Sequence, residues 1–144
     1  MVSPSRAERL DDPGIQGFLA SKEVLVLSTL QPDGSPLAMP MWFLPDGDSL
    51  VMISVAGLRK VDNLRRDPRV CVVAEAGTRG AAIRNVTVIG RAEILPDGPE
   101  RRELAGRFLQ RYHPDLERLW GARAMPADRV MFRIRPGRVR SRGI

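Results

Sequence analysis

Residues 54–73 read SVAGLRKVDNLRRDPRVCVV, and the rest of the chain can be arranged around them. An apolar run from Leu50 to Val55 leads into this stretch and predicts a strand. The run ends at Ala56-Gly57, a small and turn-prone pair. Val61 and Leu64 then follow at helical spacing, with polar residues between them. The pattern predicts a strand, a turn and one short amphipathic helix.

The predicted helix is basic at its start, and another strand follows it at once. Asp67-Pro68 ends the helix, because the residue before a proline is disfavoured in the α region, and residues 70–74 form the next strand. Arg59 and Lys60 stand where the first strand leads into the helix. At such a place the hydroxyl of Ser54, two cations and free backbone N–H groups can converge on one anion, and a phosphate suits them best. The alternative is a solvated helix start without a ligand.

Before this stretch the sequence predicts an antiparallel meander. Strand-forming segments occupy residues 23–30, 36–44 and 49–55. They are separated by Gln31 to Ser35 and by Pro45 to Asp48, two segments whose proline and glycine residues favour tight reversals. Meanders of this length usually close into a barrel or a sandwich.

The remaining segments complete a pattern of strands flanked by helices. A long, bent strand is predicted over residues 81–95, and strict alternation over residues 129–135 predicts the last strand. Asp12 and Pro13 favour a helix start near the N-terminus. Helical spacing is found in three further segments: residues 15–21, 100–112 and 115–120.

The bulk composition restricts the class of protein. A chain of 144 residues can form one domain with its own core, so residues 1–144 are expected to be a single domain. The formal net charge of +6 comes almost wholly from arginine, since Lys22 and Lys60 are the only lysines. This charge suits nucleic acid, a membrane surface or an anionic small molecule, or it is a solvated basic surface. Scarce aromatic residues and the lack of a known nucleic-acid-binding motif argue against nucleic acid.

Cysteine and histidine are each present once. Cys71 cannot form an intrachain disulfide, and its apolar strand predicts a buried, inert thiol that fits a reducing cytoplasm. A single histidine, His113, excludes a multi-histidine metal site. The sequence has no apolar run of membrane-spanning length and no G-x-S-x-G or Walker motif. We expect a soluble, cytoplasmic protein with neither a metal site nor a membrane partner.

Two motifs carry a resemblance to a known family. The pattern S-x4-RK-x3-L-x2-DP-x-V begins at Ser54, and residues 84–93 read RNVTVIGRAE. In this order and spacing they resemble the pyridoxamine 5′-phosphate oxidase-like flavin-binding split barrels, over residues 24–95 and more weakly in the last strand. The resemblance implies a mainly β fold, a six-stranded antiparallel split β-barrel with flanking helices.

The resemblance also assigns residues to cofactor binding. Arg59 and Lys60 correspond to the SRK-type turn that holds the flavin phosphate. Asn85 stands where the family carries glutamine beside the flavin ring, and its reach is shorter by one methylene. Trp42 and Phe43 have two interpretations, lining a ring pocket or filling the core. The cofactor-binding residues that the resemblance implies are Met39, Pro40, Met41, Trp42, Ser54, Arg59, Lys60, Asn63, Arg84 and Asn85.

The family includes small reductases that use the deazaflavin coenzyme F420, which are similar in length, in the uncharged strand ending at residues 40–43 and in NLRRDP at residues 63–68. This similarity implies an F420H2-dependent reduction of a small organic substrate, with F420 favoured over FMN. The alternatives are an FMN-dependent oxidase or reductase and a non-catalytic protein that binds flavin, F420 or a haem-type ligand. A true pyridoxamine phosphate oxidase is not expected, because no segment matches the family's C-terminal substrate motif. The anionic tail of F420 would lie along a basic groove formed from Arg59, Arg65, Arg66, Arg69, Arg138 and Arg140.

The resemblance further implies a homodimer with the cofactor across its two-fold interface. The apolar helical face of Leu104, Phe108 and Leu109 is expected to need cover from such a partner. Loops over residues 77–80 and 112–126 are expected to shape the substrate pocket. No residue can be assigned as a catalytic acid or base from the sequence.

Overall fold

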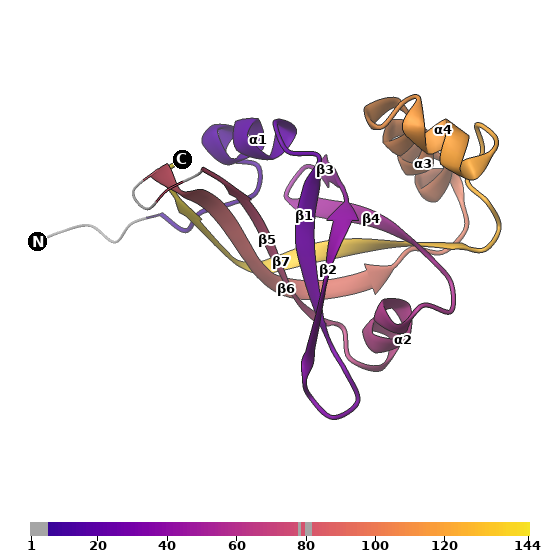
Figure 1. Cartoon of the computed structure of the whole chain (residues 1–144), viewed down its shortest axis with the longest axis horizontal. Coiled ribbons are helices and arrows are strands. Elements are labelled where there is room, and N and C mark those ends of the chain that lie inside the picture. The colour runs from indigo at the N-terminus through magenta and orange to yellow at the C-terminus, as the bar shows by residue number, and fades with distance from the viewer. Residues whose placement is uncertain (1–5, 78, 80–81) are drawn as a thin grey trace, which may run out of the picture.

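One curled antiparallel sheet carries the other elements of the chain (Figure 1). The computed structural model describes residues 6–77, 79 and 82–144. Along the sheet the strands follow the order β2-β1-β5-β6-β7-β4-β3, and all neighbouring pairs are antiparallel. The fold is therefore mainly β, a half-barrel with β2 and β3 at its two edges. The strands are β1 (Val24–Leu30), β2 (Pro36–Trp42), β3 (Leu44–Asp46), β4 (Ser49–Val55), β5 (Arg69–Ala76), β6 (Arg84–Ile94) and β7 (Arg129–Arg142).

The prediction of six strands is wrong, because the predicted strand over residues 36–44 is divided at Phe43 into β2 and β3. The backbone N–H of Phe43 donates to the hydroxyl of Tyr112 at 2.9 Å. The same hydroxyl lies 2.8 Å from the carbonyl oxygens of Phe43 and Glu23. The backbone of Phe43 thus bonds to a side chain from far along the sequence, so the chain can leave one strand and enter another. The reversal that follows is also shorter than predicted, since Pro45 and Asp46 belong to β3.

The last strand is twice as long as the alternating pattern predicts. β7 has 14 residues, and Pro136-Gly137 lies within it instead of ending it. The register with β6 shifts between Ile89 and Gly90, which marks a β-bulge. A Cβ atom at Gly90 would lie 2.3 Å from the carbonyl oxygen of Arg135, so only glycine fits this close approach. The bulge lets β7 bend, and only its first part also pairs with β4.

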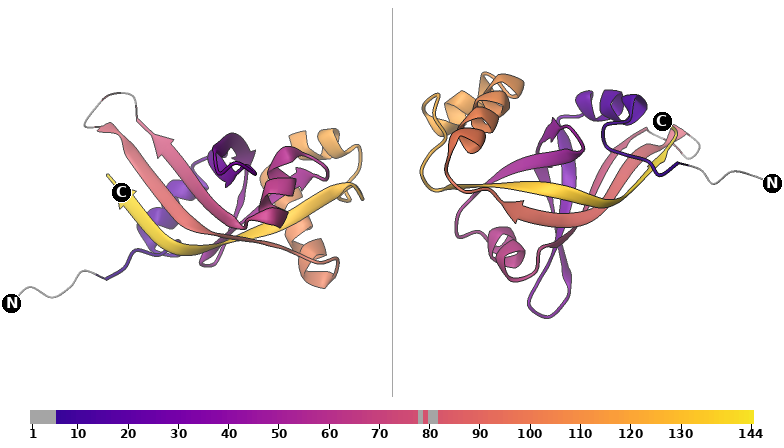
Figure 2. Two further views of the ribbon diagram at one scale, coloured as in Figure 1. Left: turned by 90° about the horizontal axis from the view of Figure 1, so that it is seen from below. Right: turned by 180° about the vertical axis from the view of Figure 1, so that it is seen from behind.

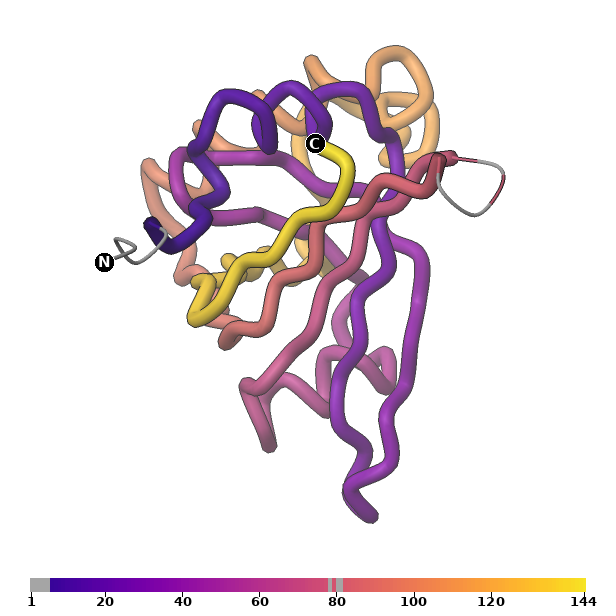
Figure 3. The backbone as a smooth tube through the Cα atoms, turned by 90° about the vertical axis from the view of Figure 1, so that its left-hand side faces the viewer, coloured from indigo at the N-terminus to yellow at the C-terminus, as the bar shows by residue number. Residues whose placement is uncertain are grey.

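The predicted helices are confirmed with small differences at their ends. They are α1 (Pro13–Ala20), α2 (Arg59–Arg66), α3 (Pro99–Arg111) and α4 (Asp115–Trp120). The α3–α4 pair lies apart from α1, and the β1–β2 hairpin projects beside α2 (Figures 2 and 3). None of the helices in the described residues is both long and apolar enough to cross a membrane.

Two hydrophobic cores lie on opposite sides of β4. Leu50 and Met52 belong to the core inside the half-barrel, which is closed by α1 and by Leu64 of α2. Val51 belongs to the second core, which packs under α3 and α4. A strand that is buried on both faces accounts for the continuous apolar run before the basic turn.

The expectation that the apolar face of α3 needs a partner subunit is wrong. Leu104 and Phe108 are only 3% and 2% exposed, because they pack in the second core with Val51 of β4 and Met131 of β7. Leu109, the third residue of this face, is partly buried against the same core.

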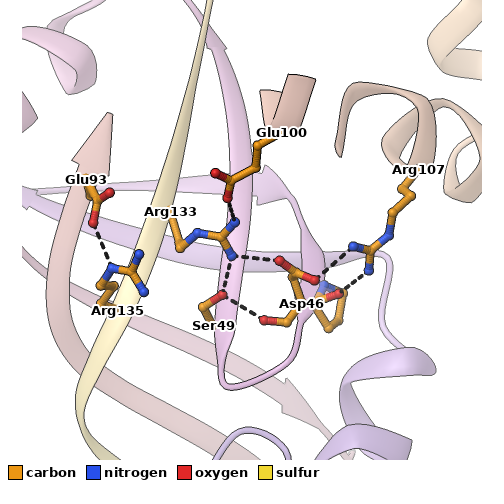
Figure 4. Close-up of polar contacts among 8 residues, drawn as sticks. Asp46, Ser49, Glu93, Glu100, Arg107, Arg133 and Arg135 are labelled. Atoms are coloured by element: carbon orange, nitrogen blue, oxygen red, sulfur yellow. Dashed lines mark hydrogen bonds and ion pairs between the residues drawn. The ribbon is translucent and has the colours of Figure 1, made fainter. Parts of the chain in front are cut away.

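Charged residues tie α3 to the sheet (Figure 4). The guanidinium of Arg133, a residue of β7 that is 6% exposed, donates to Asp46 at 2.7 Å and to Glu100 at 2.6 Å. It also donates to the hydroxyl of Ser49 at 2.7 Å. Arg107 of α3 donates to the other carboxylate oxygen of Asp46 at 2.8 Å. This Arg133 network fixes the start of α3 and its neighbouring turns against the β3–β4 hairpin.

Candidate anion-binding site

A pocket of about 230 Å³ opens where β4 leads into α2. Ser54 and Val55 of β4, Leu58 at the N-cap of α2 and Lys60 form one side of it. Residues of α3 and α4 form the opposite wall, and Trp42 of β2 also lines the pocket. The pocket thus unites Trp42, Ser54 and Lys60, three of the residues that the sequence singled out.

Lys60 is a cation without an acidic partner in the described part of the chain. Its side chain is partly buried, and the one contact of its Nζ atom is with Sδ of Met41 at 3.2 Å. Burial lowers the pKa of Lys60 from its usual range, because desolvation disfavours the charged form. The site therefore has an unbalanced, partly desolvated positive charge that an anion can neutralise.

Ser54 and the start of α2 add unused hydrogen-bond donors beside this charge. Ser54 is 6% exposed, and its hydroxyl has no hydrogen-bond partner. A buried hydroxyl without a partner costs about 1–3 kcal/mol, so a ligand that bonds to it is favoured. The N–H of Val61 bonds to the carbonyl of Leu58, which leaves the preceding N–H groups of the helix free as in other helix starts. Together these groups can hold a phosphate.

Arg129 lines the same pocket, although the sequence analysis did not identify it. It is the first residue of β7 and lies directly opposite Val55 in the antiparallel ladder with β4. Its side chain is 15% exposed, and its Nη1 atom lies 2.5 Å from Oδ1 of Asp128. No local motif indicates this placement, because it depends on pairing between strands that are far apart in the sequence.

Aromatic side chains form much of the rest of the pocket. The rings of Trp42 and Tyr112 are stacked, with centroids 4.4 Å apart and planes inclined by 3°. Because the hydroxyl of Tyr112 is bonded to the backbone at the β2–β3 break, Trp42 has a rigid support. Phe108 and Trp120 complete the wall contributed by the helices. The pocket combines a cationic end with an apolar, aromatic body.

Two residues predicted to bind the cofactor, Arg59 and Asn63, do not line this pocket. Arg59 is exposed, and its Nη1 atom lies 3.4 Å from Oε1 of Gln31 in the β1–β2 turn. Asn63 is 1% exposed and donates to the hydroxyl of Thr29 at 3.0 Å. Its amide oxygen accepts from Arg66, so Asn63 joins α2 to β1.

The expected basic groove is smaller than the sequence indicates. Arg66 bonds to Asn63 and to the carbonyl oxygen of Leu30. Arg69 pairs with Asp67 at 2.8 Å, and hydrogen bonds from Arg69 lower the pKa of Asp67 to about 2. Among the arginines that were predicted close to the phosphate, Arg59, Arg65 and Arg66 form no ion pair in the described structure, although Arg66 is held by the two neutral acceptors.

The other predicted residues occupy different places. Met41 is buried beneath Lys60, whereas Met39 and Pro40 are exposed on the edge strand β2. Arg84 and Asn85 are the first two residues of β6, and Asn85 pairs with Arg142 at the C-terminal end of β7. The guanidinium of Arg84 lies 5.4 Å from the Phe18 ring centroid. Neither residue lines the pocket in a single chain.

The structure also shows where the two remaining basic candidates and parts of the predicted loops lie. Arg138 and Arg140 lie opposite Ile89 and Thr87 and do not line the pocket. Of the loop predicted over residues 77–80, residues 78 and 80 fall outside the described residues, as does the predicted strand start at residue 81. The segment over residues 112–126 contributes Leu116, Leu119 and Trp120 to the pocket.

Side chains of the types that bind metal ions do not cluster in the described part of the chain. In residues 6–77, 79 and 82–144, no three His, Cys, Asp or Glu side chains lie together in a way that could hold a metal ion. The single histidine, His113, is exposed and contacts Glu117 at 2.9 Å.

The curled antiparallel half-barrel with its flanking helices is the fold of the pyridoxamine 5′-phosphate oxidase-like split barrels. The chain belongs to the family described as pyridoxamine 5′-phosphate oxidase, whose sequence model matches residues 12–143. Among proteins with curated descriptions, none matches the chain in sequence.

Solved structures show the same fold. A conserved hypothetical protein of Mycobacterium tuberculosis is 29% identical, with a TM-score of 0.76 and coverage of 96% of this chain and 89% of the other. A FAD-binding protein of Mesorhizobium loti is 26% identical, with a TM-score of 0.69 and coverage of 89% and 88%. A haem-binding protein of Mycobacterium smegmatis is 27% identical, with a TM-score of 0.73, and this chain spans 56% of its length. Relatives of this fold thus bind different planar ligands.

Proposed function

We propose that the protein is an oxidoreductase that binds a flavin-type cofactor, with coenzyme F420 favoured over FMN. The observation that carries the proposal is the unbalanced charge of Lys60 beside the unpaired hydroxyl of Ser54, at the free N–H groups of α2. These donors suit a phosphate, which both cofactors contain. Membership of the family and the FAD-binding relative support a flavin-type ligand.

The residues of the pocket suit binding and positioning. Lys60 and Ser54 would hold the phosphate, and the apolar side chains of α3 and α4 would exclude water from the adjoining space. The lining contains no histidine or carboxylate to act as an acid or base. A bound flavin or deazaflavin would supply the hydride chemistry, so the protein needs only to bind and orient it.

A non-catalytic, haem-type ligand is the second candidate, and it is favoured by the haem-binding relative. The pocket argues against it. Its lining contains no histidine, cysteine, methionine or tyrosine that could coordinate iron. The cationic end of the pocket agrees better with a phosphate.

The choice between the two cofactors can be tested by the salt dependence of binding. Arg59 and Arg65 form no ion pair in the described structure, so they can attract the anionic tail of F420, which FMN lacks. Titration from low to physiological ionic strength should therefore give a steeper loss of affinity for F420 than for FMN. Tighter binding of FMN throughout, with equal slopes, would identify an FMN protein instead.

We also propose that the protein is a homodimer, joined through the outer face of the sheet. This face lies away from both cores and exposes Val24, Val26 and Ile89, of which Ile89 is 53% exposed. Light scattering at micromolar concentration is expected to give a dimer. Val26→Glu should give a folded monomer, because a charge on this face opposes its burial, whereas Ser35→Glu at the hairpin tip should leave the dimer intact. A wild-type monomer would refute the proposal.

A further inference from the structure

The two cations that line the pocket differ in whether a carboxylate neutralises their charge. Lys60 has no carboxylate partner among the described residues, whereas Arg129 is paired with Asp128 at 2.5 Å. Asp128 itself does not line the pocket. The pair adds hydrogen-bond donors but almost no net charge, so the lining residues of the pocket contribute about one positive charge, that of Lys60.

We propose that Asp128 determines which anions the pocket accepts, so that the wild-type site favours a singly charged phosphodiester over a doubly charged phosphomonoester. This inference rests on the proposed function, and it names the chemical class of the bound group. A partly desolvated site is most favourable when the ligand charge balances the charge of its walls, because an excess charge of either sign is poorly solvated there. With Asp128 present, one negative charge on the ligand already balances Lys60.

The backbone around Asp128 is fixed to the anion site itself. The carbonyl of Asp128 accepts a hydrogen bond from the N–H of Ala56 at 2.7 Å, in the turn that precedes α2. The carbonyl of Arg129 accepts from Nη2 of Arg101 at 2.7 Å, which holds the start of β7 against α3. These two bonds hold the backbone of Asp128 and Arg129 beside the turn that leads to Lys60.

The side chain of Asp128 can be changed without disturbing the core. It is 64% exposed, and its only described interaction is with Arg129. Asp128→Asn removes the negative charge and keeps the shape, so the charge of Arg129 would then act on a ligand in the pocket. Arg129→Gln has the opposite effect, since it leaves Asp128 without its partner.

The test compares two flavins that differ only at the phosphate, FMN and its monomethyl phosphate ester. At pH 8 the phosphate of FMN carries close to two negative charges, because its second pKa is about 6, and the ester carries one. Asp128→Asn is expected to tighten FMN binding about tenfold and ester binding about threefold, since Coulomb energy scales with the ligand charge. Arg129→Gln should weaken the binding of both flavins, with a larger effect on FMN than on the ester.

A control variant outside the pocket tests whether the effect is specific to Asp128. Asp97→Asn removes an exposed carboxylate outside this pocket, at 3.8 Å from Arg102, and should change neither affinity. Equal changes for both flavins, or no change with Asp128→Asn, would overturn the inference while leaving the proposed function intact. If neither of these flavins nor coenzyme F420 binds to the wild type or to any variant, the proposed function fails and this inference fails with it.

Discussion

Replacement of Asp46 by alanine is expected to lower the free energy of unfolding by about 3 kcal/mol, because it leaves a buried guanidinium without one of its two carboxylate partners. Arg133 is 6% exposed and would keep only Glu100, which is itself mostly exposed, and the hydroxyl of Ser49. Arg107 would lose its ion pair in the same step. Urea denaturation of the two proteins measures the difference.

Asp97→Ala is the matched control for this change. Asp97 is exposed and lies 3.8 Å from Arg102, so its loss should alter stability by less than about 0.5 kcal/mol. Equal stabilities for the Asp46 and Asp97 variants would show that the Arg133 network does not hold α3 to the sheet. Because Phe108 of α3 lines the pocket, a loosened helix should also weaken ligand binding.

The effect of Asp46 should depend on pH in a defined direction. Hydrogen bonds from Arg107 and Arg133 lower the pKa of Asp46 below its usual range. A carboxylate with a lowered pKa contributes stability that is complete above its unfolded pKa of about 4 and is lost as the pH falls through the folded value. The difference in stability between the wild type and Asp46→Ala should therefore shrink on acidification below about pH 4.

Lys60→Met is expected to weaken cofactor binding about 10- to 150-fold, which corresponds to about 1.5–3 kcal/mol for a charge-assisted hydrogen bond. The same change should not destabilise the fold. Lys60 has no acidic partner in the described structure, and burial lowers its pKa, so its charge is unfavourable in the folded protein. At neutral pH, loss of this charge should leave the free energy of unfolding equal or higher.

Lys22→Met provides the control, because Lys22 is the only other lysine and does not line the pocket. It removes the same charge from the protein as a whole, and cofactor affinity should stay within about twofold at physiological ionic strength. Binding by fluorescence titration and stability by thermal unfolding separate the two effects. An unchanged affinity for the Lys60 variant would remove Lys60 from the site.

Sequence patterns correctly predicted the elements whose causes are local. β4 and α4 have the predicted bounds, and α2 starts at Arg59 and ends before Asp67-Pro68. Apolar spacing, turn residues and the restriction before proline act over a few residues, so they can be read from a short stretch. The motif also placed Lys60 and Ser54 together, because a strand leading directly into a helix fixes their separation.

The tertiary structure alone decided how these elements complete the site. It placed Arg129 beside Lys60, turned Arg59 toward Gln31, and used Tyr112 to divide a predicted strand at Phe43. Each outcome depends on residues that are far apart in the sequence and become neighbours only when the sheet curls. Register and side-chain packing between distant strands set these contacts, and no local pattern encodes that pairing.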